Sequence, residues 1–153
     1  LKASRSGTLH RNFMGYTHQY TELCIALGVS AISDSLYAFA QNVKVVEPYL
    51  TAINEERFPL FRGHILTDED LKHRTEILQL MCSGSTKLDP GHSSYHATRE
   101  RLEPLEADQL IHIDQDLLTV TETGKAFLRN ICMAFDQRLW ENKPESQIFS
   151  MAI

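Results

Sequence analysis

Residues 21–33, with the sequence TELCIALGVSAIS, constrain the fold of this chain more than any other segment. They are apolar from 23 to 27, cross Gly28, and continue with the β-branched Val29 and Ile32. Such a run around a glycine is typical of a strand buried on both faces, or of backbone that lies close to a ligand. An ordinary buried strand and the interior strand of a barrel both fit, and both need neighbouring strands. The segment therefore predicts that this part of the chain completes a cavity formed largely by other residues.

The composition is that of a globular protein with one core and room for an appendage. Of the 153 residues, 42% are hydrophobic and 23% are charged, which excludes a disordered or collagen-like chain. The net charge of −5 argues against a surface that binds nucleic acid. No apolar run approaches the roughly 20 residues that span a bilayer, so we expect no membrane segment. Because the chain begins with Leu and not Met, we expect it to be part of a longer polypeptide.

The cysteines indicate a reducing compartment. Cys24, Cys82 and Cys132 are odd in number and widely spaced, which fits neither a disulfide framework nor a CxxC metal site. Cys82 and Cys132 fall on apolar helical faces, where a small inert core residue is the usual interpretation. We therefore expect a cytoplasmic protein.

In the first part of the chain the pattern predicts one helix and one extended segment. Residues 42–56 place apolar side chains at spacings of three and four, with Pro48 near the first turn, and these are Val43, Val46, Tyr49, Leu50 and Ile53. Residues 57–66 carry Pro59 and Gly63 and are expected to be extended. Residues 1–62 thus combine one buried strand, one helix and irregular chain.

The second part is expected to be helical apart from one hairpin. Thr67 followed by Asp70 is a variant of the capping box, so a helix is predicted to begin there. Its helical period continues through Leu71, Arg74, Ile77, Leu78, Met81 and Cys82. Asp89-Pro90 predicts the start of the next helix, with Tyr95, Thr98 and Leu102 facing inward, and Pro104 is expected to end or bend it.

The hairpin and the last helix follow from residue 110 onward. In residues 110–121, apolar and polar side chains alternate on both sides of Asp114-Gln115-Asp116, which predicts a β-hairpin. Thr121 is expected to cap a long helix whose buried stripe comprises Phe127, Ile131, Phe135 and Leu139. We also expect Ile148, Phe149 and Met151 in the tail to dock on another surface.

The expected fold class is therefore α+β, mainly α with a small β-hairpin. The order helix, helix, hairpin, helix resembles a winged helix. We place a division near residue 62, between residues 1–62 and a compact module of residues 63–153.

A winged-helix order raises the question of DNA binding, but the charges argue against it. Between Pro90 and Asp108 two arginines stand against four acidic residues, so phosphates would be repelled. A module that packs against protein is the better interpretation. His92 and His96 are four residues apart but lack the glutamate of HExxH and a third ligand nearby, so an exposed polar face is preferred to a metal site. The sequence shows no nucleophile with a neighbouring base, and we expect no catalytic residue in it.

Half of a ligand site is predicted near the start of the chain. In LHRNFMGYT, residues 9–17, His10, Arg11 and Asn12 offer hydrogen bonds, while Phe13 and Tyr16 offer stacking faces. Gly28 in the next apolar segment would let backbone approach a ligand. Each signal is weak alone, and together they indicate an incomplete pocket.

Five segments in this order carry a resemblance to a known family: LHRNFMGYT, LGVSAIS, YAFAQN, FRGHILT and RNICMAFD. They resemble the C-terminal portion of oxygen-independent coproporphyrinogen III oxidase, a family of radical S-adenosylmethionine enzymes of heme biosynthesis. The ending QIFSMAI is similar to that family's own ending. The resemblance covers nearly the whole chain.

The resemblance implies an enzyme in two parts. An N-terminal barrel would hold a [4Fe-4S] cluster on a CxxxCxxC motif and two S-adenosylmethionine molecules, and a mostly helical C-terminal domain would cover the barrel mouth. This chain has no CxxxCxxC, so the cluster is expected in the missing N-terminal part, and the chain alone is expected to be inactive. Residues 1–62 would be the last barrel elements and 63–153 a winged-helix-like cover.

The resemblance also implies site residues and a reaction. Phe13 and Ile32 match positions that line the second S-adenosylmethionine site, with Ile32 acting through its main chain. Met14 stands where the family often has Gln, and the interval 82–110 is shorter than in many relatives. The expected reaction converts two propionates of coproporphyrinogen III to vinyl groups, giving protoporphyrinogen IX. Substrate carboxylates would meet the candidates Arg11, Tyr16, Arg62 and Arg129.

As partners we expect the enzyme's own N-terminal barrel and no nucleic acid or membrane, in an enzyme that is a monomer. The alternative is a related module for heme handling or protein interaction that is no longer catalytic.

Overall fold

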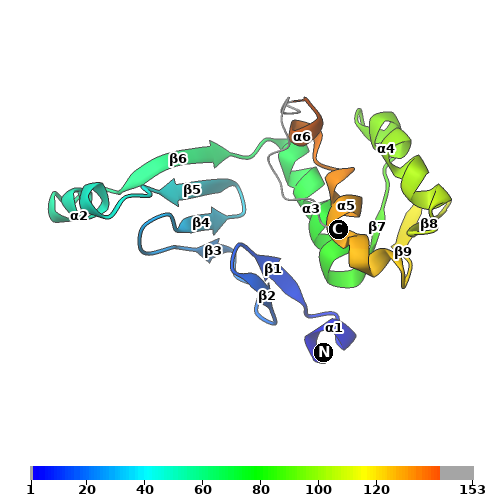
Figure 1. Ribbon diagram of the computed structural model, residues 1–153, viewed down its shortest axis with the longest axis horizontal. Coiled ribbons are helices and arrows are strands. Elements are labelled where there is room, and N and C mark those ends of the chain that lie inside the picture. Colours follow the sequence, from blue (N-terminus) through cyan, green and yellow to red (C-terminus); the bar gives the residue numbers. More distant parts are fainter. Residues whose placement is uncertain (1, 142–153) are drawn as a thin grey trace. The chain divides into compact units, whose positions relative to one another are not determined.

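The computed structural model describes residues 2–141 (Figure 1). It divides into two compact units, Leu1–Leu78 and Gln79–Ile153, which we call the N-terminal and the C-terminal unit. Helices and strands occur in both, so the fold is α+β, as expected. The structure has more strands than the single hairpin and the lone strand that the sequence pattern predicted. They form three separate sheets. The functional division near residue 62 stays a prediction.

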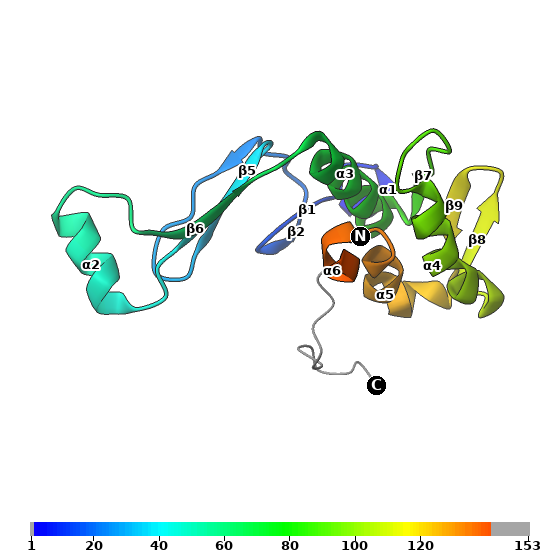
Figure 2. The ribbon, with the colours of Figure 1, turned by 90° about the horizontal axis from the view of Figure 1, so that it is seen from above.

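The N-terminal unit is built on antiparallel sheets. The short helix α1 (Lys2–Arg5) precedes a two-stranded hairpin of β1 (His10–Asn12) and β2 (Gly15–Thr17). A four-stranded sheet then follows chain order, with β3 (Leu23–Cys24), β4 (Ile32–Ser35), β5 (Ala38–Asn42) and β6 (Leu60–Ile65). Helix α2 (Val46–Asn54) lies at the end of this sheet where β5 passes to β6 (Figures 1 and 2).

The prediction of one buried strand over residues 21–33 is wrong. The segment forms β3 and the start of β4, and residues 25–31 form a loop between them. Gly28 has φ 99° and Ser30 has φ 61°, and such left-handed residues cannot continue a strand. The Leu27 side chain is 85% exposed. In this chain the apolar segment is therefore an exposed loop rather than a covered strand.

The helix expected within residues 42–56 and the extended segment after it are confirmed. Val43 lies before the first turn of α2, so it is not part of the helical face on which it was expected. The face itself is half-exposed, with Leu50 51% and Ile53 48% accessible, and Ala52 is the buried member of the helix. Strand β6 covers most of the predicted extended segment.

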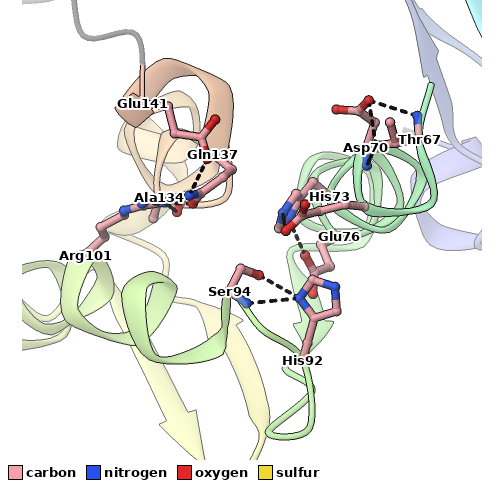
Figure 3. A network of polar contacts seen from close by, with 11 residues as sticks. Thr67, Asp70, His73, Glu76, His92, Ser94, Arg101, Ala134, Gln137 and Glu141 are labelled. Carbon is pink, nitrogen blue, oxygen red and sulfur yellow. Dashed lines mark hydrogen bonds and ion pairs between the residues drawn. The ribbon is translucent and has the colours of Figure 1, made fainter. Parts of the chain in front are cut away.

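Helix α3 (Asp68–Ser83) begins at the predicted capping box (Figure 3). The Asp70 N–H donates to Thr67 Oγ1 at 3.2 Å, and the Thr67 N–H donates to Asp70 Oδ2 at 2.9 Å. Asp68, Glu69 and Asp70 occupy the first turn, where carboxylates are stabilised by the helix dipole. The expected helical period missed Leu80, which is fully buried.

Replacing Thr67 with alanine is expected to lower the free energy of unfolding by about 1 kcal/mol, because the Asp70 N–H loses its side-chain acceptor. Urea unfolding measures the change. Thr75→Ala is the matched control, since Thr75 is exposed in the middle of the same helix and bonds only the Leu71 carbonyl in the preceding turn. Equal effects of the two substitutions would contradict the capping role.

The C-terminal unit packs short helices with a three-stranded antiparallel sheet. Its elements are the end of α3, β7 (Ser85–Lys87), α4 (Tyr95–Ala107), β8 (Ile111–Asp114), β9 (Leu117–Val120), the 3-10 helix η1 (Gly124–Phe127), α5 (Leu128–Met133) and α6 (Gln137–Glu141). The sheet order is β7-β9-β8. The predicted hairpin is confirmed as β8–β9, whereas β7 was not predicted.

The apolar core lies in this unit. Its buried hydrophobic side chains come from both helices and strands, and they are Leu80, Leu88, Leu102, Ile111, Leu118, Val120, Ile131, Cys132, Ala134 and Phe135. Cys82 is half-buried. Thr98 is also buried, as the helix expected after Asp89-Pro90 required.

Two helix predictions in this unit need correction. Helix α4 begins at Tyr95 rather than at Asp89-Pro90, because Asp89 Oδ1 accepts the Gly91 N–H and closes a turn instead. Pro104 lies inside α4 and does not end it.

The single long helix after Thr121 is divided into η1, α5 and α6. Thr121 does cap the first turn, through the Gly124 N–H at 3.0 Å. Asp136 Oδ1 then accepts the Leu139 N–H at 3.0 Å and starts α6 anew. As a result Ile131 and Phe135 are buried as expected, while Phe127 is 45% exposed.

Arg101 ties α4 to α6 (Figure 3). Its guanidinium donates to the Ala134 carbonyl at 3.2 Å and to Gln137 Oε1 at 3.0 Å, and it lies 5.0 Å from the Trp140 ring centroid. Partial burial lowers the pKa of Arg101 from its usual value by desolvation, against the opposing effect of nearby carboxylates.

The winged-helix likeness of this unit stays a prediction. Ile148, Phe149 and Met151, expected to dock, lie outside the described residues. Within residues 2–141, no helix combines the length and apolarity that crossing a membrane requires.

Candidate functional site

The β1–β2 hairpin presents Phe13 and Met14 at its turn. The Met14 N–H donates to Asn12 Oδ1 at 2.9 Å, which closes the turn. The two side chains are 55% and 91% exposed. On the strands, Arg11 faces Tyr16, with the guanidinium carbon 4.9 Å from the ring centroid. The hairpin thus holds all five predicted residues of LHRNFMGYT, His10, Arg11, Asn12, Phe13 and Tyr16, on one small element.

One face of the four-stranded sheet carries two rows of functional side chains. In the first row Ile32 pairs with Gln41, and Gln41 pairs with Arg62. The Arg62 Nε–H donates to Gln41 Oε1 at 3.0 Å, so these two side chains point to the same side. In the second row Asp34 pairs with Phe39, and Phe39 pairs with His64.

The two rows share a face because side chains two residues apart on a strand point the same way. They are separated by about 7 Å along the strands. Phe13 reaches this face from the hairpin, and its ring meets Phe39 edge-on at 5.0 Å between centroids and 88° between planes. The structure therefore brings Phe13, Ile32 and Arg62 to one side of one sheet.

The loop of residues 25–31 borders this face and is fixed by two buried or half-buried side chains. Asn42 is 5% exposed, and its amide Nδ2 donates to the carbonyls of Ala26 at 3.2 Å and Gly28 at 2.9 Å. The Gly28 N–H donates to Tyr49 Oη at 3.0 Å. The glycine predicted to allow close approach does adopt a conformation that other residues avoid.

Ile32 has strand pairing mainly on one side. It pairs with Gln41 of β5, whereas β3 pairs with β4 only through Leu23–Ser35 and Cys24–Asp34. Within the described residues, β3 has therefore ended before it comes opposite Ile32. That Ile32 offers its main chain to a ligand stays a prediction.

Other predicted residues are placed differently. Arg129 lies exposed on α5 in the C-terminal unit, so its part in the same site stays a prediction. His92 precedes α4, so it does not share a helical face with His96. Its Nδ1 forms a hydrogen bond of 2.8 Å with Ser94 Oγ. Within residues 2–141, no group of three or more His, Cys, Asp or Glu side chains is arranged to hold a metal ion.

Sequence reasoning missed three residues of this face. Asp34, Phe39 and Arg74 join in one contact group, in which Arg74 from α3 bonds Asp34 and lies over Phe39. The signal was present in the pattern, because Arg74 interrupts an otherwise apolar helical period. Phe39 and Gln41 also lie within YAFAQN, one of the five segments that carry the family resemblance.

Comparison with known proteins identifies relatives over nearly the whole chain, although no protein-family model matches it. The chain is 36% identical over 163 residues to oxygen-independent coproporphyrinogen III oxidase of Synechocystis sp., and the match covers 99% of the chain and 35% of that protein. The identity is 37% over 159 residues to the enzyme of the same name from Escherichia coli, with the same two coverages. The Thermostichus vulcanus enzyme is 38% identical over 162 residues, covering 99% of the chain and 49% of the relative.

A solved structure agrees with these relatives. Coproporphyrinogen III oxidase from Escherichia coli, described as a radical S-adenosylmethionine enzyme, superposes with a TM-score of 0.80 at 36% identity, covering 90% of this chain and 34% of that one. The chain thus spans about a third of the length of the first two relatives. The expected resemblance, to the C-terminal portion of this kind of enzyme, is confirmed.

Proposed function

We propose that this chain is the C-terminal part of a radical S-adenosylmethionine enzyme that oxidatively decarboxylates two propionates of coproporphyrinogen III to vinyl groups, giving protoporphyrinogen IX. The relatives carry the name of that activity. In this proposal residues 1–62 complete the barrel, and residues 63–153 form its winged-helix-like cover. The whole enzyme is a cytoplasmic monomer that binds neither nucleic acid nor membrane.

The observation that carries the proposal is the missing core of the N-terminal unit. Among its described residues, Ala52 and Pro59 are the buried apolar side chains. All but four of the exposed large hydrophobic side chains of residues 2–141 lie between Phe13 and Ile65. Exposed apolar surface on this scale marks an interaction site. A barrel supplied by the rest of the polypeptide would cover it.

The residues of the site suit a second S-adenosylmethionine. The half-exposed Phe13 ring offers an apolar face to an adenine or thioether group, and Ile32 offers main-chain groups on the side where β3 has ended. Reduced by one electron from the cluster in the N-terminal part, bound S-adenosylmethionine would supply the 5'-deoxyadenosyl radical that takes a hydrogen atom from the propionate. In this proposal Phe13 and Ile32 hold the ligand in place, and this part of the chain keeps water away from it.

The [4Fe-4S] cluster does not fit on this chain. Cys24, Cys82 and Cys132 lie on β3, α3 and α5, and the described residues contain no cluster of ligands. We therefore assign the cluster, and most S-adenosylmethionine contacts, to the N-terminal part of the enzyme.

The substrate's carboxylates account for the cationic candidates. Arg62 uses its Nε–H to bond Gln41, and its Nη groups remain as donors for a carboxylate. The guanidinium of Arg11 lies over the Tyr16 ring. Guanidinium groups bind carboxylates through paired, charge-assisted hydrogen bonds, which would hold the reacting carbon in place. Arg129 would act from the cover in the same way.

The test is made in the complete enzyme, anaerobically reconstituted. Phe13→Ala is expected to raise the KM for S-adenosylmethionine about tenfold, a loss of about 1.4 kcal/mol of binding, while the iron-sulfur absorption is unchanged. Phe127→Ala is the matched control, because Phe127 is exposed in the C-terminal unit. Turnover of both variants at the wild-type KM would refute the assignment of Phe13. Absence of an iron-sulfur chromophore in the complete protein would refute the catalytic role and favour the module for heme handling.

A further inference from the structure

We propose that Arg74 is a positioning residue for Phe13 and acts through Phe39. The inference rests on the proposed function, because Phe13 has a task only if a ligand meets its ring. It assigns to α3 a role beyond supporting the cover, namely fixing one wall of the ligand site.

Arg74 is held from three directions. Its Nη2 donates to both carboxylate oxygens of Asp34, at 2.8 and 3.0 Å, and its Nη1 donates to the Ser35 carbonyl at 3.0 Å. The guanidinium carbon lies 4.9 Å from the centroid of the Phe39 ring. Both charged side chains are largely buried, with 20% of Arg74 and 12% of Asp34 exposed.

This arrangement requires an arginine. A planar guanidinium can stack on a ring while its edge donates to a carboxylate and to a carbonyl. Lysine would keep the charge but lose the stacked plane and at least one donor direction. Methionine would keep the bulk and leave the Asp34 carboxylate buried without its cation, which is costly.

The contacts then pass to the hairpin. Phe39 contacts both the guanidinium of Arg74 and, in a T-shaped arrangement, the ring of Phe13. The hairpin itself has three residues in each strand, and a two-stranded hairpin of this size is marginally stable on its own. The ring of Phe13 therefore depends on Phe39 for its orientation, and Phe39 depends on Arg74.

The first measurement is hydrogen exchange at residues 10–17 in the complete enzyme without ligand. Arg74→Met and Phe39→Leu are expected to speed exchange there about tenfold. Arg74→Lys is expected to fall between wild type and Arg74→Met. Arg57→Met is the control, since Arg57 is exposed and pairs with Glu55 next to α2. Unchanged exchange in Arg74→Met would overturn the inference, whatever the ligand.

The second measurement separates positioning from folding. Arg74→Met is expected to raise the KM for S-adenosylmethionine several-fold more than it lowers kcat, and to add little in a Phe13→Ala background. Equal, additive effects in both backgrounds would overturn the coupling to Phe13. If Phe13→Ala alone leaves the KM unchanged, the ligand-binding role of Phe13 is refuted. Faster exchange in Arg74→Met would then still support the contacts from Arg74 through Phe39 to Phe13.

Discussion

Replacing Gly124 with alanine is expected to unfold the C-terminal unit or to destabilise it by about 3 kcal/mol or more. Gly124 is buried, and a Cβ built on it would overlap the Leu110 carbonyl oxygen, lying 2.8 Å from the carbonyl carbon and 3.1 Å from Val120 Cγ1. The obstacle is backbone rather than a flexible side chain, so the strain cannot be relieved by a rotamer change.

The neighbouring contacts explain why the backbone cannot move aside. The Leu110 carbonyl accepts the Thr121 N–H at 3.0 Å, and the Leu110 N–H donates to the Leu105 carbonyl at 2.9 Å. The Gly124 N–H in turn donates to Thr121 Oγ1. A shift of either segment would break the connection between α4, the β8–β9 hairpin and η1.

Two other glycines give a graded control in urea unfolding. Gly91→Ala is expected to change stability by less than about 0.5 kcal/mol, because the new Cβ would meet only Asp89 Oδ1 at 3.4 Å. Gly84→Ala should cost about 1 kcal/mol, since φ is +74° but no atom lies within 4 Å. An unfolding free energy for Gly124→Ala equal to that of Gly91→Ala would disprove the steric argument.

Local signals in the sequence predicted the C-terminal unit better than the N-terminal one. The cap at Thr121 and the alternation of apolar and polar residues over 110–121 act through neighbours in the chain, and both are observed. The same local chemistry divides the last helix, because Asp136 is a strong N-cap residue inside a pattern that predicts one continuous helix. Strand β7 has three residues and no periodicity long enough to detect.

The antiparallel sheets of the N-terminal unit could not be predicted in the same way, because most of its apolar side chains are exposed among the described residues. An apolar run normally predicts burial, yet Ile25 is 70% and Leu27 is 85% exposed. The prediction that this segment completes a cavity fits that exposure, whereas the prediction of a strand failed at the positive φ of Gly28 and Ser30. Phe13 and Ile32 were proposed from the family resemblance, and Arg62 as a cation for the substrate's carboxylates; all three stay predictions. Arg74 requires the fold, since its partner Asp34 is 40 residues away.

Asn42→Asp is expected to open the loop of residues 25–31. The substitution preserves the shape of the side chain but replaces the Nδ2 donor with an oxygen that faces the carbonyls of Ala26 and Gly28. Asn42 is 5% exposed, so water cannot screen the new repulsion. The loss of two hydrogen bonds and the burial of an unpaired charge together should cost about 3 kcal/mol.

The effect should be local, because the described residues of the N-terminal unit form no large apolar core that would couple the loop to the rest of the molecule. Hydrogen exchange at Gly28 is expected to rise by about a hundredfold, as about 3 kcal/mol implies, while amides in the β8–β9 hairpin stay protected. Asn130→Asp, the same change at an exposed position of α5, should leave both regions unchanged. Acid should partly reverse the opening, because a protonated carboxyl regains one O–H donor for these carbonyls. Uniform acceleration in both units, or no pH dependence, would mean that Asn42 does not hold the loop through its amide.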